Sequence, residues 1–412
     1  MSVYLSRDII DEVAEILIRR QIIQMSDPDD MLYGLSFKSC CTDETFIKIQ
    51  RRVELVGEFA DEISLFDQKF RLLVIGKMVY LCSYDQICLP DDCSEFFAVA
   101  MFHYLHEVPV FTRINFRGID SSRTRSMSGL FRNCNVQEIY FDKLDTSHVT
   151  DMSEMFYGCR IDRLNFGNLD TSKVTNMKGM FSYCQISELC FGPLDTSGVT
   201  DMSEMFLGCN INRLDLSRLD TSNVKNMEKM FESSEIHELN FTNFNTSRVV
   251  NMSKMFRRCR IPGVDIRHFD TSSVRTMSGM FENSSVKIKG IQYLDTSNVT
   301  NMSYMFKNYQ YLDETDLSGL DTSKVKSMTG MFEGCRAYKL DLSNFDTSRV
   351  TRMRRMFFKC KAPQVDIRGF DTSCLRDARN MFYQCSAEKI LMSEEGQTEL
   401  KELLGLNKIT YK

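Results

Sequence analysis

The chain of 412 residues contains no tryptophan, whereas methionine (26) and phenylalanine (30) are abundant, a skew typical of one template copied many times. No apolar run reaches 18 residues, so no membrane-spanning helix is expected. The N-terminal segment has acidic residues inside its apolar stretch and lacks a basic start followed by a small-residue cleavage site. This argues against a secretory signal and favours a cytoplasmic protein.

Catalytic motifs are also missing from the sequence. We find no Gly-rich phosphate loop, no nucleophile elbow and no paired metal-binding motif. We therefore expect neither an enzyme nor a cofactor. The 15 cysteines stand in a chain without an export signal, so reduced thiols are expected rather than disulfides.

The formal net charge of −5 is unevenly distributed. Residues 1–110 contain 10 Lys and Arg against 19 Asp and Glu, whereas residues 111–412 contain 41 against 37. An acidic N-terminal segment followed by a mildly basic remainder of the chain permits contacts with nucleic acid or with acidic partners, but does not require them.

A segment of the type LDTSHVTDMSEMFYGC (Leu144–Cys159) recurs through most of the chain. Nine of the ten intervals between copies are 25 residues long, and one, between Asp295 and Asp321, is 26. The first residue of the Asp-Thr-Ser motif marks the eleven copies: Asp120, Asp145, Asp170, Asp195, Asp220, Asn245, Asp270, Asp295, Asp321, Asp346 and Asp371. Such a fixed period predicts stacked structural repeats.

Each copy has two apolar patterns, one on each side of the aspartate. Before it, Leu164 and Phe166 alternate with polar residues, which predicts a very short strand. After it, apolar residues recur at helical spacing, which predicts a short helix whose first turn is capped by Asp-Thr-Ser. In one copy they are Val174, Met177, Met180, Phe181 and Cys184. The predicted fold class is an α/β repeat solenoid of eleven strand–turn–short-helix units.

One copy cannot bury its own apolar face, so the copies must stack. Stacking would place equivalent residues in columns, with a phenylalanine column running from Phe131 to Phe382 and methionine columns beside it. A cysteine column, from Cys134 to Cys385, is expected to be buried as small apolar side chains.

The consensus Leu-Asp-Thr-Ser-x-Val-Thr-x-Met-Ser-x-Met-Phe-x-x-Cys resembles the 26-residue repeat of bacterial surface proteins, which is grouped with the BspA-like leucine-rich repeats. The resemblance covers about Phe111–Ala387. It implies a leucine-rich-repeat-like solenoid with adhesion or protein-binding roles. Similar repeats occur in bacterial surface proteins and lipoproteins and in large DNA viruses of amoebae. Because no export signal or anchor is visible here, an intracellular protein is favoured, located in a host cytoplasm or a virion if the chain is viral.

The repeats predict three parts: an α/β N-terminal cap domain (1–110), the eleven-repeat solenoid (111–387) and a C-terminal capping helix and tail (388–412). Apolar periodicity in the cap predicts helices over Arg7–Gln24, Phe46–Ile63 and Phe96–His106 and two strands within Phe70–Cys82. The closing helix is expected over Ser393–Leu404.

The cap also contains residues of the types that bind zinc, namely Cys82, Cys88, Cys93, His103 and His106. Their spacing is irregular and includes no Cys-x-x-Cys pair, so a packed core is favoured over a metal site.

Two surface features are candidates for binding. The outward strand position becomes acidic in the later repeats and could dock a basic partner; its candidate residues are Asp215, Asn240, Asp265, Asp316, Asp341 and Asp366. A basic cluster could bind nucleic acid or an acidic protein, or could be a solvated face; it comprises Arg349, Arg352, Arg354, Arg355, Lys359, Lys361 and Arg368.

The function that these patterns favour is a non-enzymatic scaffold that presents a rigid solenoid surface to a protein partner. An adaptor whose acidic cap recruits a second partner, and electrostatic binding of nucleic acid through the basic cluster, are the alternatives.

Overall fold

The computed structural model describes residues 2–4, 34–38, 59–65, 68–75, 78–82, 86–89, 91–94, 113–116, 119–141, 144–167 and 169–393. The chain divides into two compact units, one comprising Met1–Val199 with Cys209–Leu214 and the other Thr200–Gly208 with Asp215–Lys412. The division falls within the repeats. The domain limits expected at residues 110 and 387 remain predictions.

The first unit is built on strands. They are β1 (Ser2–Tyr4), β2 (Gly34–Lys38), β3 (Phe59–Leu65), β4 (Gln68–Ile75), β5 (Met78–Cys82), β6 (Gln86–Cys88), β7 (Arg113–Asn115), β8 (Ile119–Asp120), β9 (Asn135–Tyr140), β10 (Arg160–Asn165), β11 (Gln185–Cys190) and β12 (Asn210–Asp215). The main sheet has the order β3-β4-β5-β2-β7-β9-β10-β11-β12, and β1, β6 and β8 form a small parallel sheet.

The second unit contains β13 (Glu235–Asn240), β14 (Val264–Asp265), β15 (Ile288–Lys289), β16 (Lys339–Asp341), β17 (Gln364–Asp366) and β18 (Lys389–Leu391). Two short 3-10 helices, η2 (Ile291–Tyr293) and η3 (Leu312–Glu314), lie between β15 and β16 along the chain. Strands β14 and β15 pair with each other, and β16, β17 and β18 form a separate parallel sheet.

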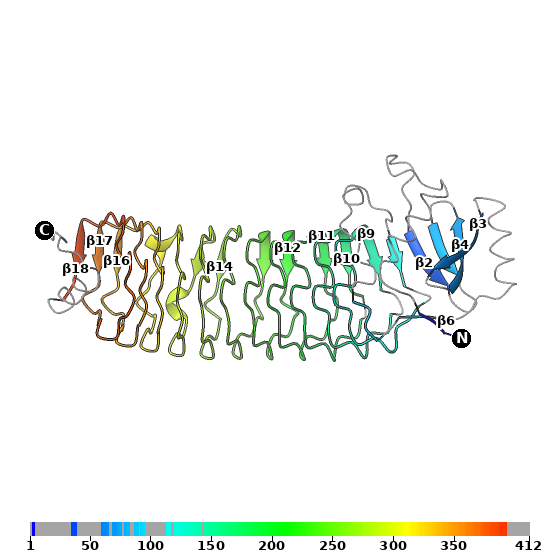
Figure 1. Cartoon of the computed structure of the whole chain (residues 1–412), viewed down its shortest axis with the longest axis horizontal. Coiled ribbons are helices and arrows are strands. Elements are labelled where there is room, and N and C mark those ends of the chain that lie inside the picture. Colours follow the sequence, from blue (N-terminus) through cyan, green and yellow to red (C-terminus); the bar gives the residue numbers. More distant parts are fainter. Residues whose placement is uncertain are drawn as a thin grey trace. The chain divides into compact units, whose positions relative to one another are not determined.

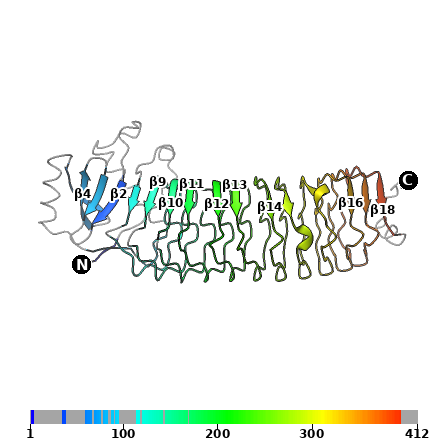
Figure 2. The same ribbon diagram turned by 180° about the vertical axis from the view of Figure 1, so that it is seen from behind.

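The repeats form a parallel β-solenoid of about ten turns. Strand β10 pairs with β11 so that Arg160 lies beside Gln185, a step of one repeat. In Figure 1 the strands β9, β10 and β11 lie side by side along one edge of the ribbon, and the turns of the same repeats lie along the opposite edge. Figure 2 shows the same arrangement for β16 and β18 of the second unit. Stacking of the repeats is therefore confirmed.

The predicted short helices are absent from the described repeats, so the α/β class was wrong. Each repeat instead holds two residues of positive φ four positions apart, such as Glu154 (φ 53°) and Gly158 (φ 70°), where an α-helix needs φ near −63°. Alternate N–H groups donate to the next turn, from Glu154 to the Lys178 carbonyl (2.8 Å) and from Phe156 to that of Met180 (2.9 Å). The stacked neighbour thus supplies the partners that a helix would find internally.

Asp-Thr-Ser likewise closes a turn rather than capping a helix. The Asp170 carboxylate accepts the Ser172 N–H (3.0 Å), and the Thr171 hydroxyl donates to the Asp195 carbonyl of the next turn (2.7 Å). The expected role of side-chain oxygen as acceptor of a free N–H was right, but no helix begins there.

The core consists of the predicted columns. Phe131 and Phe156 are fully buried, and their rings stack with centroids 5.4 Å apart; Phe332 and Phe357 repeat this at 5.9 Å in the second unit. The methionines are buried beside them, as at Met152 and Met155 of one repeat. The continuous apolar spine predicted from the sequence is therefore confirmed within each unit.

The two ends test the remaining expectations only in part. Antiparallel strands β4 and β5 confirm the two strands expected within Phe70–Cys82. The helix expected over Phe46–Ile63 is wrong from Phe59 onward, where strand β3 begins, since these residues pair with β4. The helices expected over Arg7–Gln24 and Phe96–His106, and nearly all of Ser393–Leu404, lie outside the described residues.

Candidate functional site: a groove in the strand face

The residues at the outward strand position (Asp215, Asn240, Asp265, Asp316, Asp341 and Asp366), which we call the acidic ladder, stand at strand ends except for Asp316, and their side-chain oxygens form local hydrogen bonds. Asp215 accepts the backbone N–H of Ser217 (3.0 Å) and the side-chain amide of Asn240 (3.0 Å). Asp316 accepts the N–H of Ser318 (2.9 Å). Such Asx turns hold the chain as it leaves the strand, so these residues have a structural role that does not depend on any partner.

Three other aspartates of the acidic ladder also form an ion pair with a lysine or arginine side chain. Arg267 binds Asp265 through a nitrogen–oxygen contact of 2.6 Å, and Lys339 binds Asp341 at 2.8 Å. Hydrogen bonds from these side chains hold the pKa of both carboxyl groups at about 2. Asp366 was expected to face solvent but is buried, because Arg368 folds over it at 2.7 Å.

The basic cluster divides into paired and unpaired members. Arg355 is half-buried and binds Glu333 (2.9 Å), and Arg368 is held by Asp366. The other five are exposed, with no ion pair to any described residue: Arg349, Arg352, Arg354, Lys359 and Lys361. The basic cluster predicted from the sequence therefore contains five cations without an ion pair to a described residue and two, Arg355 and Arg368, that are neutralised by acidic partners.

The candidate zinc ligands are only partly described. Cys88 and Cys93 are buried, and the Cys93 thiol donates to the Ser126 carbonyl (3.1 Å). Burial raises the pKa of Cys93 to about 12. His103 and His106 lie outside the described residues, as does the side chain of Cys82. No group of three metal-ligating side chains is found in the part of the chain that the structure describes.

The strand face of the second unit is interrupted between β15 and β16. Strands β13, β14, β16 and β17 end in Asn or Asp, whereas β15 ends in Lys289 and is followed by Gly290, whose φ of 99° favours glycine. A Cβ there would lie 2.8 Å from the Arg267 backbone nitrogen, so the close approach of the two turns also requires glycine. The next repeat carries the one extra residue of the array and forms η3 in place of a strand.

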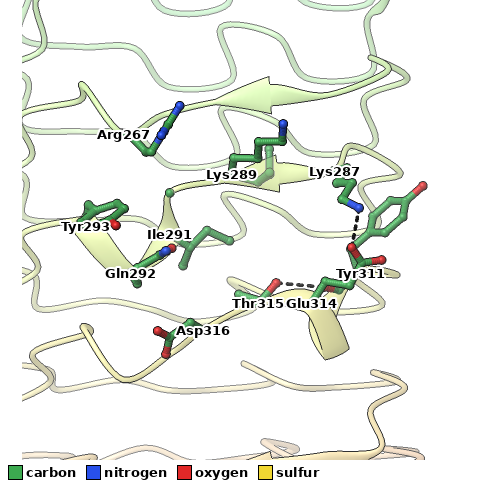
Figure 3. A pocket seen from close by; sticks show the side chains of 12 residues that line it. Arg267, Lys287, Lys289, Ile291, Gln292, Tyr293, Tyr311, Glu314, Thr315 and Asp316 are labelled. Carbon is green, nitrogen blue, oxygen red and sulfur yellow. Dashed lines mark hydrogen bonds and ion pairs between the residues drawn. The ribbon is translucent and has the colours of Figure 1, made fainter.

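The interruption leaves an open groove of about 350 Å³ on the strand face (Figure 3). Lys289 lies in the middle of the view, Tyr293 and Gln292 on one side and Tyr311 on the other. Lys287 is bound to Glu314, whereas Lys289 is exposed and has no ion pair among the described residues. Tyr293 exposes 63% of its surface. The groove therefore combines an available cation with accessible aromatic rings.

A second hollow of about 390 Å³ shares Thr315 and Asp316 with the groove and extends to β16. Lys339, Asp341 and Asn344 line its far part. The two hollows together span the gap between the sheet of β14 and β15 and that of β16, β17 and β18. A ligand longer than one side chain can therefore be accommodated.

The groove was not predicted from the sequence, although three departures from the consensus mark its place. They are Gly290 where neighbouring repeats have Asp or Asn, Tyr309 in the cysteine column and the 26-residue interval between Asp295 and Asp321. Each was visible as an irregularity. Their common location became apparent only when the turns were stacked.

Stacked parallel turns, with the same hydrogen bonds repeated from turn to turn, define the class of the protein as a β-solenoid repeat protein. The chain belongs to the family described as Mycoplasma protein of unknown function, DUF285, which it matches over residues 125–210, 186–289 and 282–394. No curated protein and no solved structure matches the chain. Within the part of the chain that the structure describes, we find no helix with the length and hydropathy of a transmembrane segment.

Proposed function

We propose that this protein is a non-catalytic interaction scaffold and that the groove between β15 and β16 binds a segment of a protein partner. The observation that carries the proposal is the change of charge at the groove. Strands β13, β14, β16 and β17 end in Asn or Asp, whereas β15 ends in Lys289, which has no ion pair among the described residues and is followed by Gly290.

The shape and lining of the groove favour an extended acidic segment as its ligand. Two adjoining hollows suit several consecutive side chains better than one compact molecule. A carboxylate could pair with Lys289. An apolar or aromatic side chain could pack on Tyr293, since tyrosine provides a large contact area at low entropic cost.

The family resemblance supports the same class of function, because BspA-like repeats imply adhesion or protein binding. On this proposal the acidic residues 1–110 could recruit a second partner, which would make the protein an adaptor. A viral origin and a place in a virion rest on the resemblance alone.

We also propose a reducing compartment such as the cytoplasm. Buried thiols of the cysteine column act as hydrogen-bond donors: Cys184 donates to the Phe156 carbonyl (2.7 Å) and Cys335 to that of Phe306 (2.6 Å). Oxidation to a disulfide would remove these donors, which supports thiols as the functional state.

Selection of a random peptide library on the purified protein tests the proposal. We expect enrichment of acidic peptides whose binding is lost with Lys289→Glu and weakened about tenfold or more with Tyr293→Ala, as expected for an interface hot spot. Lys173→Glu, an exposed change in the first unit, is the matched control and should leave binding intact. Failure to enrich any peptide, or enrichment that ignores both groove substitutions, would refute the groove as the docking site.

A further inference from the structure

In the second unit, acidic and basic side chains alternate from one repeat to the next at the position that follows the phenylalanine column. Arg257 binds both Glu232 (2.7 Å) and Glu282 (3.0 Å). Lys307 lies 3.6 Å from Glu282 and 3.4 Å from Glu333. The three glutamates are buried, so each cation in this row is compensated by carboxylates.

The alternation stops after Glu333. The next two residues at the same repeat position are Phe358 and Tyr383, whose rings stack with centroids 5.7 Å apart and planes 15° apart. The Arg355 guanidinium lies 3.8 Å from the centre of the Phe358 ring. Tyr383 exposes 55% of its surface. The row therefore ends in a stacked aromatic pair with an accessible outer ring.

Exposed cations lie in the repeat that contains Phe358 and in the repeat before it, and Lys359 lies 5.3 Å from the centre of the Phe358 ring. We call them the terminal basic face; its members are Arg352, Arg354, Lys359 and Lys361, with Arg336 bridged to Lys361 in the adjacent turn. All are exposed, and none forms an ion pair with a described residue. Of the acids in these turns, Asp377 is bound by Arg379 at 2.8 Å and Glu333 by Arg355 at 2.9 Å, which leaves the exposed Glu388 against these cations. The net charge of the face is therefore positive.

We propose that the terminal basic face binds single-stranded nucleic acid. Guanidinium and ammonium groups would pair with successive phosphates. A base would stack on the outer face of Tyr383 and extend the existing Phe358–Tyr383 stack. An acidic protein would use the charges without needing the aromatic ring. A membrane surface would need apolar side chains to insert, and the exposed ring in this region belongs to a tyrosine.

None of the cations of the terminal basic face lines either hollow of the groove, so this proposal does not depend on the proposed function. The two can fail separately. Groove variants should leave nucleic-acid binding unchanged, and variants of the terminal basic face should leave peptide binding unchanged.

Fluorescence anisotropy with a labelled 20-nucleotide single strand, as RNA and as DNA, tests the proposal on the full chain. We expect binding in 50 mM KCl and a fall in log affinity with log salt of about 0.7 per neutralised phosphate, thus a slope near −3 for four contacts. The quadruple change R352Q/R354Q/K359Q/K361Q should reduce affinity at least about tenfold and bring the slope close to zero.

The contribution of stacking is tested by Tyr383→Ala, with Tyr383→Phe as the conservative variant. Loss of one stacked base is expected to cost about 5- to 150-fold in affinity, and the phenylalanine should restore binding. The matched charge control, R160Q/R163Q/K173Q/K178Q, removes four exposed cations from the first unit and should have little effect. Circular dichroism of each variant checks folding.

Several outcomes would overturn the assignment. They are no binding at low salt, equal binding by the quadruple variant, and equal or tighter binding of polyglutamate or anionic vesicles. Tyr383→Ala binding as tightly as the unmodified protein would also overturn it, because a charge-only surface would not distinguish a single strand from another polyanion.

Discussion

The hydroxyl of Tyr309 accepts a hydrogen bond from the backbone N–H of Ile288 in the preceding turn, at 3.3 Å. Tyr309 occupies the place that cysteine has in most other repeats, and it is fully buried. Burial raises its pKa to about 12, so the phenol stays protonated at neutral pH. A side-chain oxygen thus accepts the hydrogen bond of this strand N–H. In the preceding repeat, the N–H of Val264 donates instead to the backbone carbonyl of Lys287 in the next turn.

Tyr309→Phe should therefore destabilise the second unit. It removes the acceptor while leaving the ring, so the Ile288 N–H is left buried and unsatisfied at a cost of about 1–3 kcal/mol. Urea unfolding monitored by circular dichroism measures the loss. The matched control Tyr293→Phe removes an exposed hydroxyl and should change stability by less than about 0.5 kcal/mol. Equal stability of the two variants would mean that the hydrogen bond contributes nothing.

This contact also shows what the sequence could and could not predict. The period and the apolar columns follow directly from the repeats, because only stacking buries Phe156 and its equivalents. The absence of helices did not follow, since the spacing of Met152, Met155 and Phe156 suits one helix face as well as successive turns. Glycine or asparagine at six of the eleven second positive-φ positions, as at Gly158, was the available indication of turns.

The groove was harder to predict for a different reason. It depends on how three departures in two neighbouring repeats combine, and a consensus sequence averages such departures away. Similarly, Arg355 and Arg368 belonged to a basic cluster in the sequence, whereas their partners Glu333 and Asp366 become neighbours through stacking and local folding. Pairing of charges is a tertiary property, so the available cations could not be separated from the compensated ones beforehand.

Arg257→Met should be strongly destabilising. Arg257 binds Glu232 and Glu282, both buried, and removing it leaves two carboxylates without that partner. Breaking a buried ion pair on one side costs about 3–5 kcal/mol. Thermal and urea unfolding measure the effect. Replacing both carboxylates as well, in R257M/E232Q/E282Q, should recover most of the stability, because the buried charges are then absent.

The matched control for that substitution lies three residues away. Arg260→Met disrupts an exposed pair with Glu235, whose atoms are 3.7 Å apart, and should cost less than about 1 kcal/mol. Equal losses for the two arginine variants would contradict an energetic role for the buried row of charges.

The array should lose stability in acid between pH of about 4 and about 2. The pKa of Asp265 is lowered to about 2 by Arg267, that of Asp341 by Lys339 and Ser343, and that of Asp377 by Arg379. Because these pKa values lie below the ordinary 3.8, the unfolded chain takes up protons first as the pH falls. Their stabilisation is present above pH of about 4 and disappears as the pH approaches 2.

Urea midpoints at pH 5, 4, 3 and 2 measure this dependence. Asp341→Asn should make the decline shallower, since one of the shifted carboxyl groups is removed. A midpoint that does not change between pH 4 and pH 2 would contradict the stabilising role of these hydrogen-bonded aspartates.

Alkylation of the native protein by iodoacetamide at pH 7 should divide the described cysteines into two groups. Cys190 and Cys374 are exposed, and Cys385 is half-buried with its pKa lowered to about 7 by a hydrogen bond with Cys360, so these should react. Cys184 and Cys209 are buried, and desolvation raises the pKa of both thiols. They should react only after the chain is unfolded in guanidinium, as peptide mass spectrometry would show. If Cys184 in the native protein reacted as fast as Cys190, the stacked turns would have to separate readily. That result would contradict the burial of the cysteine column.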